Sequence, residues 1–181
     1  MSPKRFHISW ILVGVTVVIF AMMQGRARAQ TNAQTLYEKK ALCIYGMAAW
    51  IGWPEKAFTD KKSFVIGVLG EEAFVQAFEK VPKTIVDQTT KLERNIIVNK
   101  ISDINEAKGC QVLFIGASEK ERLPEIVKFC ERSSILTIAE IEGFTEKDGG
   151  IIQIGGQVKI SPSAAGKARL KIPAKLLDAC K

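Results

Sequence analysis

Three short, nearly uninterrupted apolar runs constrain the fold more than any other feature of this sequence. They are residues 64–69 (FVIGVL), 111–115 (QVLFI) and 135–139 (ILTIA). Runs of this length without polar alternation are typical of strands that are buried on both faces of a sheet. A helical pattern follows each of the first two runs, so strands and helices alternate along the chain. This order predicts an α/β protein.

The remaining segments add helices and further strands. Apolar residues recur every three or four positions over residues 31–50, which predicts an amphipathic helix ended by Gly52 and Pro54. Residues 84–87 and 92–101 have β-like patterns. Ser118 with Glu121 forms a capping-box pattern before a helix that reaches residue 131.

The sequence of the C-terminal third predicts a hairpin followed by two helices. Gly155-Gly156 is suited to a two-residue turn between residues 151–154 and 157–161. Residues 162–180 are helical in two pieces, broken near Pro173. We therefore expect a single mixed β-sheet flanked by helices on both faces, with a hairpin and helices at the C-terminal end.

The first 29 residues have the pattern of an export signal. A positively charged start, with Lys4 and Arg5, precedes an uncharged apolar run over residues 8–23 and an A-x-A ending at Ala29. This predicts a signal peptide over residues 1–29, cleaved after Ala29, and a mature domain over residues 30–181. The alternative is an uncleaved anchor, since the run is slightly shorter than the ~20 residues that span a bilayer. After cleavage the domain is not membrane-embedded.

Export changes the balance of charge and removes the only histidine. The net charge is +7, but four bases and no acid lie in the first 29 residues, which leaves +3. We therefore expect no nucleic-acid partner. His7 is lost as well, and Ser or Cys nucleophiles usually need a His base, while zinc sites use His or closely spaced Cys. We expect no enzyme, no metal site and no cofactor.

The four cysteines are far apart and form no C-x-x-C motif, which is typical of structural disulfides in an oxidising compartment. They are Cys43, Cys110, Cys130 and Cys180. A helix that runs back along its preceding strand brings Cys130 near Cys110, within the ~4.4–6.8 Å Cα separation of a disulfide. We expect this bond. Cys43 and Cys180 then either pair with each other or stay free.

Two tryptophans, Trp50 and Trp53, lie where the first helix ends. Large aromatic side chains are enriched at interaction hot spots. They are equally suited to filling the end of a core.

The mature chain resembles the YfiR family in the order and spacing of several short motifs. They are AAWIGWP (residues 48–54), VLG (68–70), CQVLFI (110–115), ILTI (135–138), GF (143–144), GG (149–150), AA (164–165) and LL (176–177). The resemblance implies a small periplasmic α/β protein that is not an enzyme. It further implies binding to, and repression of, the periplasmic sensor domain of an inner-membrane diguanylate cyclase, which lowers cyclic di-GMP and biofilm formation.

The chain departs from the family pattern at specific positions. Many relatives carry a cysteine where this chain has residues 64–67 (FVIG), so Cys110 lacks that partner. Relatives tend to have FEIN where this chain has residues 158–161 (VKIS), and a glycine where it has Arg169. If this edge contacts the cyclase, Lys159, Ser161 and Arg169 lie at the interface. Alternatively, Lys159 only protects an exposed edge strand from aggregation.

A second function remains open, that of a periplasmic small-ligand-binding sensor module. Exported α/β domains often have clefts at the carboxyl ends of strands, here near Gly70, Gly116 and Ala139. A homodimer is compatible with either function.

Overall fold

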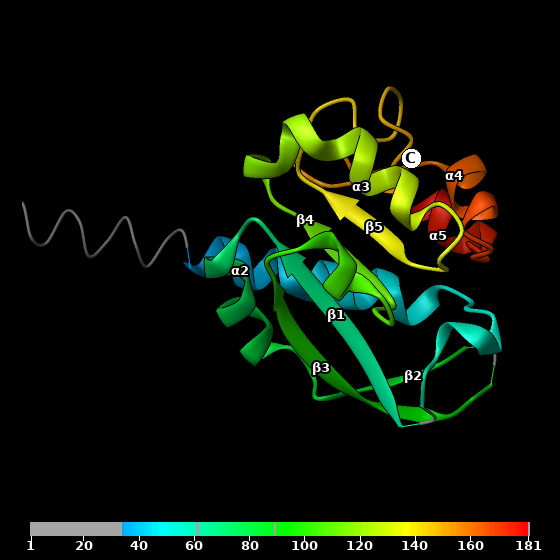
Figure 1. Ribbon diagram of the computed structural model, residues 1–181. Helices are drawn as coiled ribbons and strands as arrows, with labels where there is room; N and C mark the ends of the chain where they lie inside the picture. Colours follow the sequence, from blue (N-terminus) through cyan, green and yellow to red (C-terminus); the bar gives the residue numbers. More distant parts are fainter. Residues whose placement is uncertain (1–33, 61, 89, 181) are drawn as a thin grey trace, which may run out of the picture. The chain divides into compact units, whose positions relative to one another are not determined.

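The structure, a computed structural model, describes residues 34–60, 62–88 and 90–180 (Figure 1). The chain divides into two units, residues 1–37 and residues 38–181. Residues 34–37 are the described part of the first unit and are helical, and residues 38–50 are helical in the second unit. The predicted signal peptide lies outside the described residues. None of the helices within the described ranges is long and apolar enough to cross a membrane.

In the described part of the chain, seven strands form one mixed sheet in the order β2-β3-β1-β4-β5-β6-β7. The strands are β1 (Ser63–Leu69), β2 (Thr84–Val86), β3 (Glu93–Ile101), β4 (Val112–Ile115), β5 (Leu136–Ala139), β6 (Ile152–Gln153) and β7 (Lys159–Ile160). The five central strands are parallel, and β2 and β7 are antiparallel edge strands. The expectation of a mixed sheet is confirmed.

The apolar runs occupy the centre of this sheet. β4 and β5 are buried along their whole length, and β1 lies between β3 and β4. β3 has an alternating pattern of exposure, as expected for a half-exposed strand. Continuous apolar sequence is therefore found where neighbouring strands and helices exclude water from both faces.

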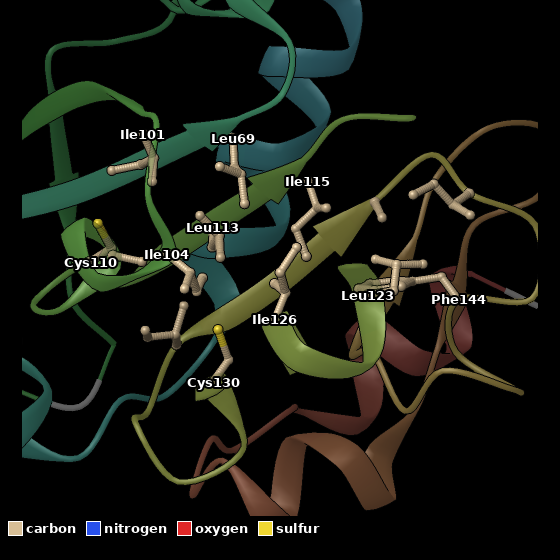
Figure 2. Packing of buried hydrophobic residues seen from close by; sticks show 14 residues of the cluster. Leu69, Ile101, Ile104, Cys110, Leu113, Ile115, Leu123, Ile126, Cys130 and Phe144 are labelled. Carbon is tan, nitrogen blue, oxygen red and sulfur yellow. The ribbon is translucent and has the colours of Figure 1, made fainter. Parts of the chain in front are cut away.

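Helices cover both faces of the sheet. The helical elements after residue 50 are η1 (Glu55–Ala57), α2 (Glu72–Ala77), η2 (Phe78–Lys80), η3 (Ile104–Ala107), η4 (Ala117–Arg122), α3 (Leu123–Cys130), α4 (Pro162–Lys167) and α5 (Ala174–Ala179). On one face, Leu113 of β4 shares a buried cluster with Leu123 and Ile126 of α3 (Figure 2). On the other, Phe114 stacks on Phe74 of α2 with ring centroids 4.1 Å apart. Figure 1 shows α3 alongside β5, while the helix over residues 38–50 passes behind β1.

Two local predictions are wrong. Ser118 does not cap a helix, because it lies inside η4, whose N-cap is Gly116, and its hydroxyl donates to the Gly70 carbonyl at 2.8 Å. The hairpin between β6 and β7 is longer than a two-residue turn and includes residues 154–158. The Ile154 N–H still donates to the Ala139 carbonyl of β5, so the chain turns only after that contact.

Candidate functional site

Four of the five residues predicted to bind a partner, all except Trp50, line two hollows of the surface. The first is a groove of about 880 Å³ beside the edge strand β7, here called the β7 groove. Half-buried Val158, Ile160 and Leu177 contribute apolar surface to it, whereas Lys159 and Glu146 contribute charges. β7 pairs only with β6, so its other edge has no strand partner among the described residues. An apolar centre with a polar rim is the composition of protein interfaces.

Lys159 of the edge strand β7 forms an ion pair across to a neighbouring loop. Its Nζ lies 2.8 Å from Oε1 of Glu146, in a loop that also lines the β7 groove. The hydrogen bond and the opposite charge raise the pKa of Lys159 and lower the pKa of Glu146. Both side chains are exposed, so the pair is accessible from solvent.

Ser161 has a structural role in addition to its place in the β7 groove. It is the N-cap of α4, and its Oγ accepts a hydrogen bond from the Ala164 N–H at 3.3 Å. Pro162 follows at the first position of the helix, where its missing N–H costs no helical hydrogen bond.

Replacing Ser161 with alanine is expected to lower the free energy of unfolding by about 1 kcal/mol, because an N–H of the first helical turn loses its acceptor. Urea denaturation measures this change. Ser163→Ala is the matched control, since Ser163 is exposed within α4 and is not its N-cap. Equal losses in the two variants would contradict the capping role.

The second hollow is a small pocket of about 150 Å³, here called the basic pocket. It is lined by residues 52–54 and by Arg169 and Lys171. Gly52 and Lys171 hold these segments together through two backbone hydrogen bonds of 2.9 Å in an isolated antiparallel bridge. The structure thus brings together Trp53 and Arg169, which are far apart in the sequence, and adds Lys171, which the sequence analysis missed.

The two tryptophans have different environments. The helix ends at residue 50, where Trp50 is 51% exposed. Trp53 lies beyond the helix and is only 2% exposed, with its ring edge-on to Phe64 at a centroid distance of 5.1 Å. Trp50 therefore has the accessibility that a partner contact needs, whereas Trp53 belongs mainly to the core and contributes to the wall of the basic pocket.

Arg169 has a left-handed backbone conformation with φ of 62°. It directly follows the C-cap of α4, where its N–H donates to the Gly166 carbonyl at 3.0 Å and the Leu170 N–H donates to the Ala165 carbonyl at 2.9 Å. These two bonds form a Schellman motif, whose left-handed position is usually glycine. The motif explains why a glycine suits this position and why arginine is strained there.

All four cysteines are free thiols in the structure, so the Cys110–Cys130 disulfide stays a prediction. Cys110 and Cys130 lie in one buried cluster (Figure 2). Burial raises the pKa of Cys110 to about 11 and that of Cys130 to about 12, the latter with a smaller contribution from Cys110. Partial burial also raises the pKa of Cys43, with a contribution from Cys180. Cys110 thus lies near Cys130, the expected pair, and Cys43 lies near Cys180, for which the sequence analysis left both pairing and free thiols open.

Protein atoms pack closely at two of the strand ends proposed as a ligand cleft, those near Gly70 and Gly116. β1 and β4 lie where the strand order reverses, the usual ligand position in such sheets. A Cβ at Gly116 would lie 2.8 Å from the carbonyl carbon and oxygen of Gly70, and Ser118 binds that oxygen. Beyond β5, Glu140 forms an ion pair with Lys40 at 2.6 Å. These contacts do not favour a ligand site there.

Comparison with known proteins identifies one family. A family model described as YfiR/HmsC-like matches residues 37–180, which includes every strand of the sheet and both surface hollows. No curated protein matches the chain.

Proposed function

Because the chain belongs to the YfiR/HmsC-like family, we propose that it binds and represses the periplasmic sensor domain of an inner-membrane diguanylate cyclase. The family is periplasmic and regulatory rather than catalytic. Repression of the cyclase lowers cyclic di-GMP and biofilm formation. The family match over residues 37–180 is the observation that carries this proposal.

The β7 groove is the proposed contact surface for the cyclase. It combines an edge strand, half-buried apolar side chains and the exposed Lys159–Glu146 pair. A free strand edge offers unpaired backbone groups to a partner. Charged side chains at the rim of such a surface mainly set the association rate and the specificity of binding.

Replacing Lys159 with glutamate is expected to weaken partner binding about tenfold, which corresponds to ~1.4 kcal/mol. The change reverses one charge at the rim and places two carboxylates side by side, because Glu146 is the ion-pair partner of Lys159. We expect the free energy of unfolding to change by only about 0.5 kcal/mol, as for most surface substitutions. Binding is measured with the isolated sensor domain, and repression as cellular cyclic di-GMP.

Lys100→Glu is the matched control for Lys159→Glu. Lys100 of β3 is also exposed and also pairs with a glutamate, Glu72, at 2.9 Å, but it does not line the β7 groove. Only the Lys159 variant should raise cyclic di-GMP. If both variants repress as well as the wild type, the β7 groove is not the contact surface.

The function itself is tested by a deletion in the native host. Loss of the gene should raise cyclic di-GMP and biofilm formation, and the tagged mature protein should bind the purified sensor domain of the cyclase it regulates. If the deletion leaves cyclic di-GMP unchanged, the repressor assignment is wrong whatever the groove variants do.

A further inference from the structure

The basic pocket has donors but no acidic side chain in its wall. Its charged lining residues are Arg169 and Lys171, and both side chains are exposed. Neither forms an ion pair with another residue in the part of the chain that the structure describes. Two unneutralised positive charges therefore border one small hollow.

Trp53 also lines this pocket, and it carries an unpaired hydrogen-bond donor. Trp53 is buried, and its indole Nε1 has no hydrogen-bond partner among the described residues. Buried N–H groups in native proteins are nearly always paired, so an orphan at this position needs an explanation. A negatively charged group would complement Arg169 and Lys171, and its acceptor atoms would lie beside the residue that carries the unpaired indole N–H.

Arg169 is kept in its strained conformation although glycine would relieve it. A side chain at φ of 62° disfavours the folded state, and the Schellman motif requires only the backbone of this residue. Residues held in rarely populated backbone conformations cluster at functional sites. The guanidinium at the pocket, rather than the helix end, is the feature that only arginine supplies.

We propose that the basic pocket binds a carboxylate, and that this carboxylate is an aspartate or glutamate side chain on the protein partner. The inference rests on the proposed function, because it names the partner group recognised. A guanidinium matches a carboxylate with two parallel hydrogen bonds. A volume of about 150 Å³ accommodates the end of one such side chain, since one water has a share of about 30 Å³.

A carboxylate on a protein suits this pocket better than a free small acid. Exposed Arg169 and Lys171 would hold a free anion only weakly, because salt and water screen surface charges. A protein partner excludes that water as it docks, which strengthens the ion pair. Trp50, exposed two positions before Gly52, adds an aromatic contact of the kind found with arginine at interaction hot spots.

Arg169→Gly is the main test variant, and Lys91→Gly is its matched control. Lys91 is also basic and exposed, and it has φ of 60°, but it lies in the turn between β2 and β3 and does not line the pocket. Each change removes one positive charge and one strained side chain. Both variants should therefore fold with an unfolding temperature at or above that of the wild type. Only Arg169→Gly should weaken sensor-domain binding, by about tenfold or more.

The recognised group is tested by titration with blocked amino acids, followed through the Trp53 indole N–H signal in NMR spectra. N-acetyl-aspartate N-methylamide should cause a saturable shift, and the asparagine analogue should not. The shift should disappear in Arg169→Gly and persist in Lys91→Gly. Equal shifts with both analogues would overturn the carboxylate assignment. Acetate binding more tightly than the blocked aspartate would assign the pocket to a free acid and overturn the partner assignment.

Cyclic di-GMP in the native host separates this inference from the proposed function. Arg169→Gly should raise cyclic di-GMP towards the level of the deletion strain, whereas Lys91→Gly should not. If the deletion raises cyclic di-GMP but Arg169→Gly represses like the wild type, the pocket inference fails and the repressor function stands. If the deletion itself has no effect, the repressor function fails.

Discussion

Replacing Asp87 with alanine is expected to lower the free energy of unfolding by about 3–5 kcal/mol. Asp87 Oδ2 lies 3.5 Å from Nη2 of Arg94, and both side chains are almost fully buried. Arg94 also stacks over the Phe58 ring at 3.5 Å, and its Nη1 donates to the Asp60 carbonyl at 3.2 Å. Loss of Asp87 leaves a guanidinium buried without its counter-charge, which is the costly state for such a pair.

A double-mutant cycle measured by urea denaturation tests this prediction. Arg94→Met combined with Asp87→Ala removes both charges, so the double variant should lose less stability than the two single variants added together. Glu72→Ala breaks the exposed pair with Lys100 and should cost at most about 1 kcal/mol. Two results would contradict a stabilising buried pair. In the first, the double variant loses as much stability as the two single variants added together. In the second, Asp87→Ala loses no more stability than Glu72→Ala.

Replacing Gly150 with alanine is expected to destabilise the protein by about 3 kcal/mol, because the core has no room for a methyl group there. A Cβ at this position would lie 2.2 Å from two atoms of the Phe144 ring. Phe144 is completely buried in the cluster that contains Leu123 (Figure 2), and the Gly150 N–H donates to the Phe144 carbonyl at 2.9 Å. Neither the ring nor the backbone can move without disturbing the core.

Gly46→Ala is the control for this prediction. Gly46 lies in the helix that ends at residue 50, and apart from its chain neighbours and the adjacent helix backbone no atom lies within 4 Å of the position of its missing Cβ. Alanine there should raise the free energy of unfolding by about 0.5–1 kcal/mol, as expected inside a helix. In the Gly150→Ala background, Phe144→Leu should restore part of the lost stability. If Gly150→Ala is as stable as the wild type, the ring does not pack as described.

The sequence predicted the elements whose signals are local and repeated. The run over residues 64–69 became β1, the apolar periodicity before Gly52 became a helix, and Pro173 separates α4 from α5. Ser118 was predicted wrongly because the helical turn η4 begins one residue before it, directly after β4, and the fold brings a backbone carbonyl within reach of its hydroxyl. Here that carbonyl belongs to Gly70, at the end of a neighbouring strand.

The candidate site could be predicted only in part, because it depends on contacts between segments that are distant in the sequence. Lys159 and Arg169 were identified as departures from the family pattern, and Trp50 and Trp53 as a pair of aromatic residues. The sequence could not separate the two tryptophans, since their environments depend on where the helix ends and on which ring meets Phe64. It also could not find Lys171, whose place is set by its backbone bridge to Gly52.

The sequence by itself determined the class of fold, since apolar periodicity and glycine or proline positions act over a few residues and set strands, helices and their ends. Family membership likewise depends on short motifs in a given order. Only the tertiary structure decided the strand order, the Lys159–Glu146 pair and the basic pocket. These depend on contacts between segments distant along the chain, and such contacts form only when the whole core packs and excludes water.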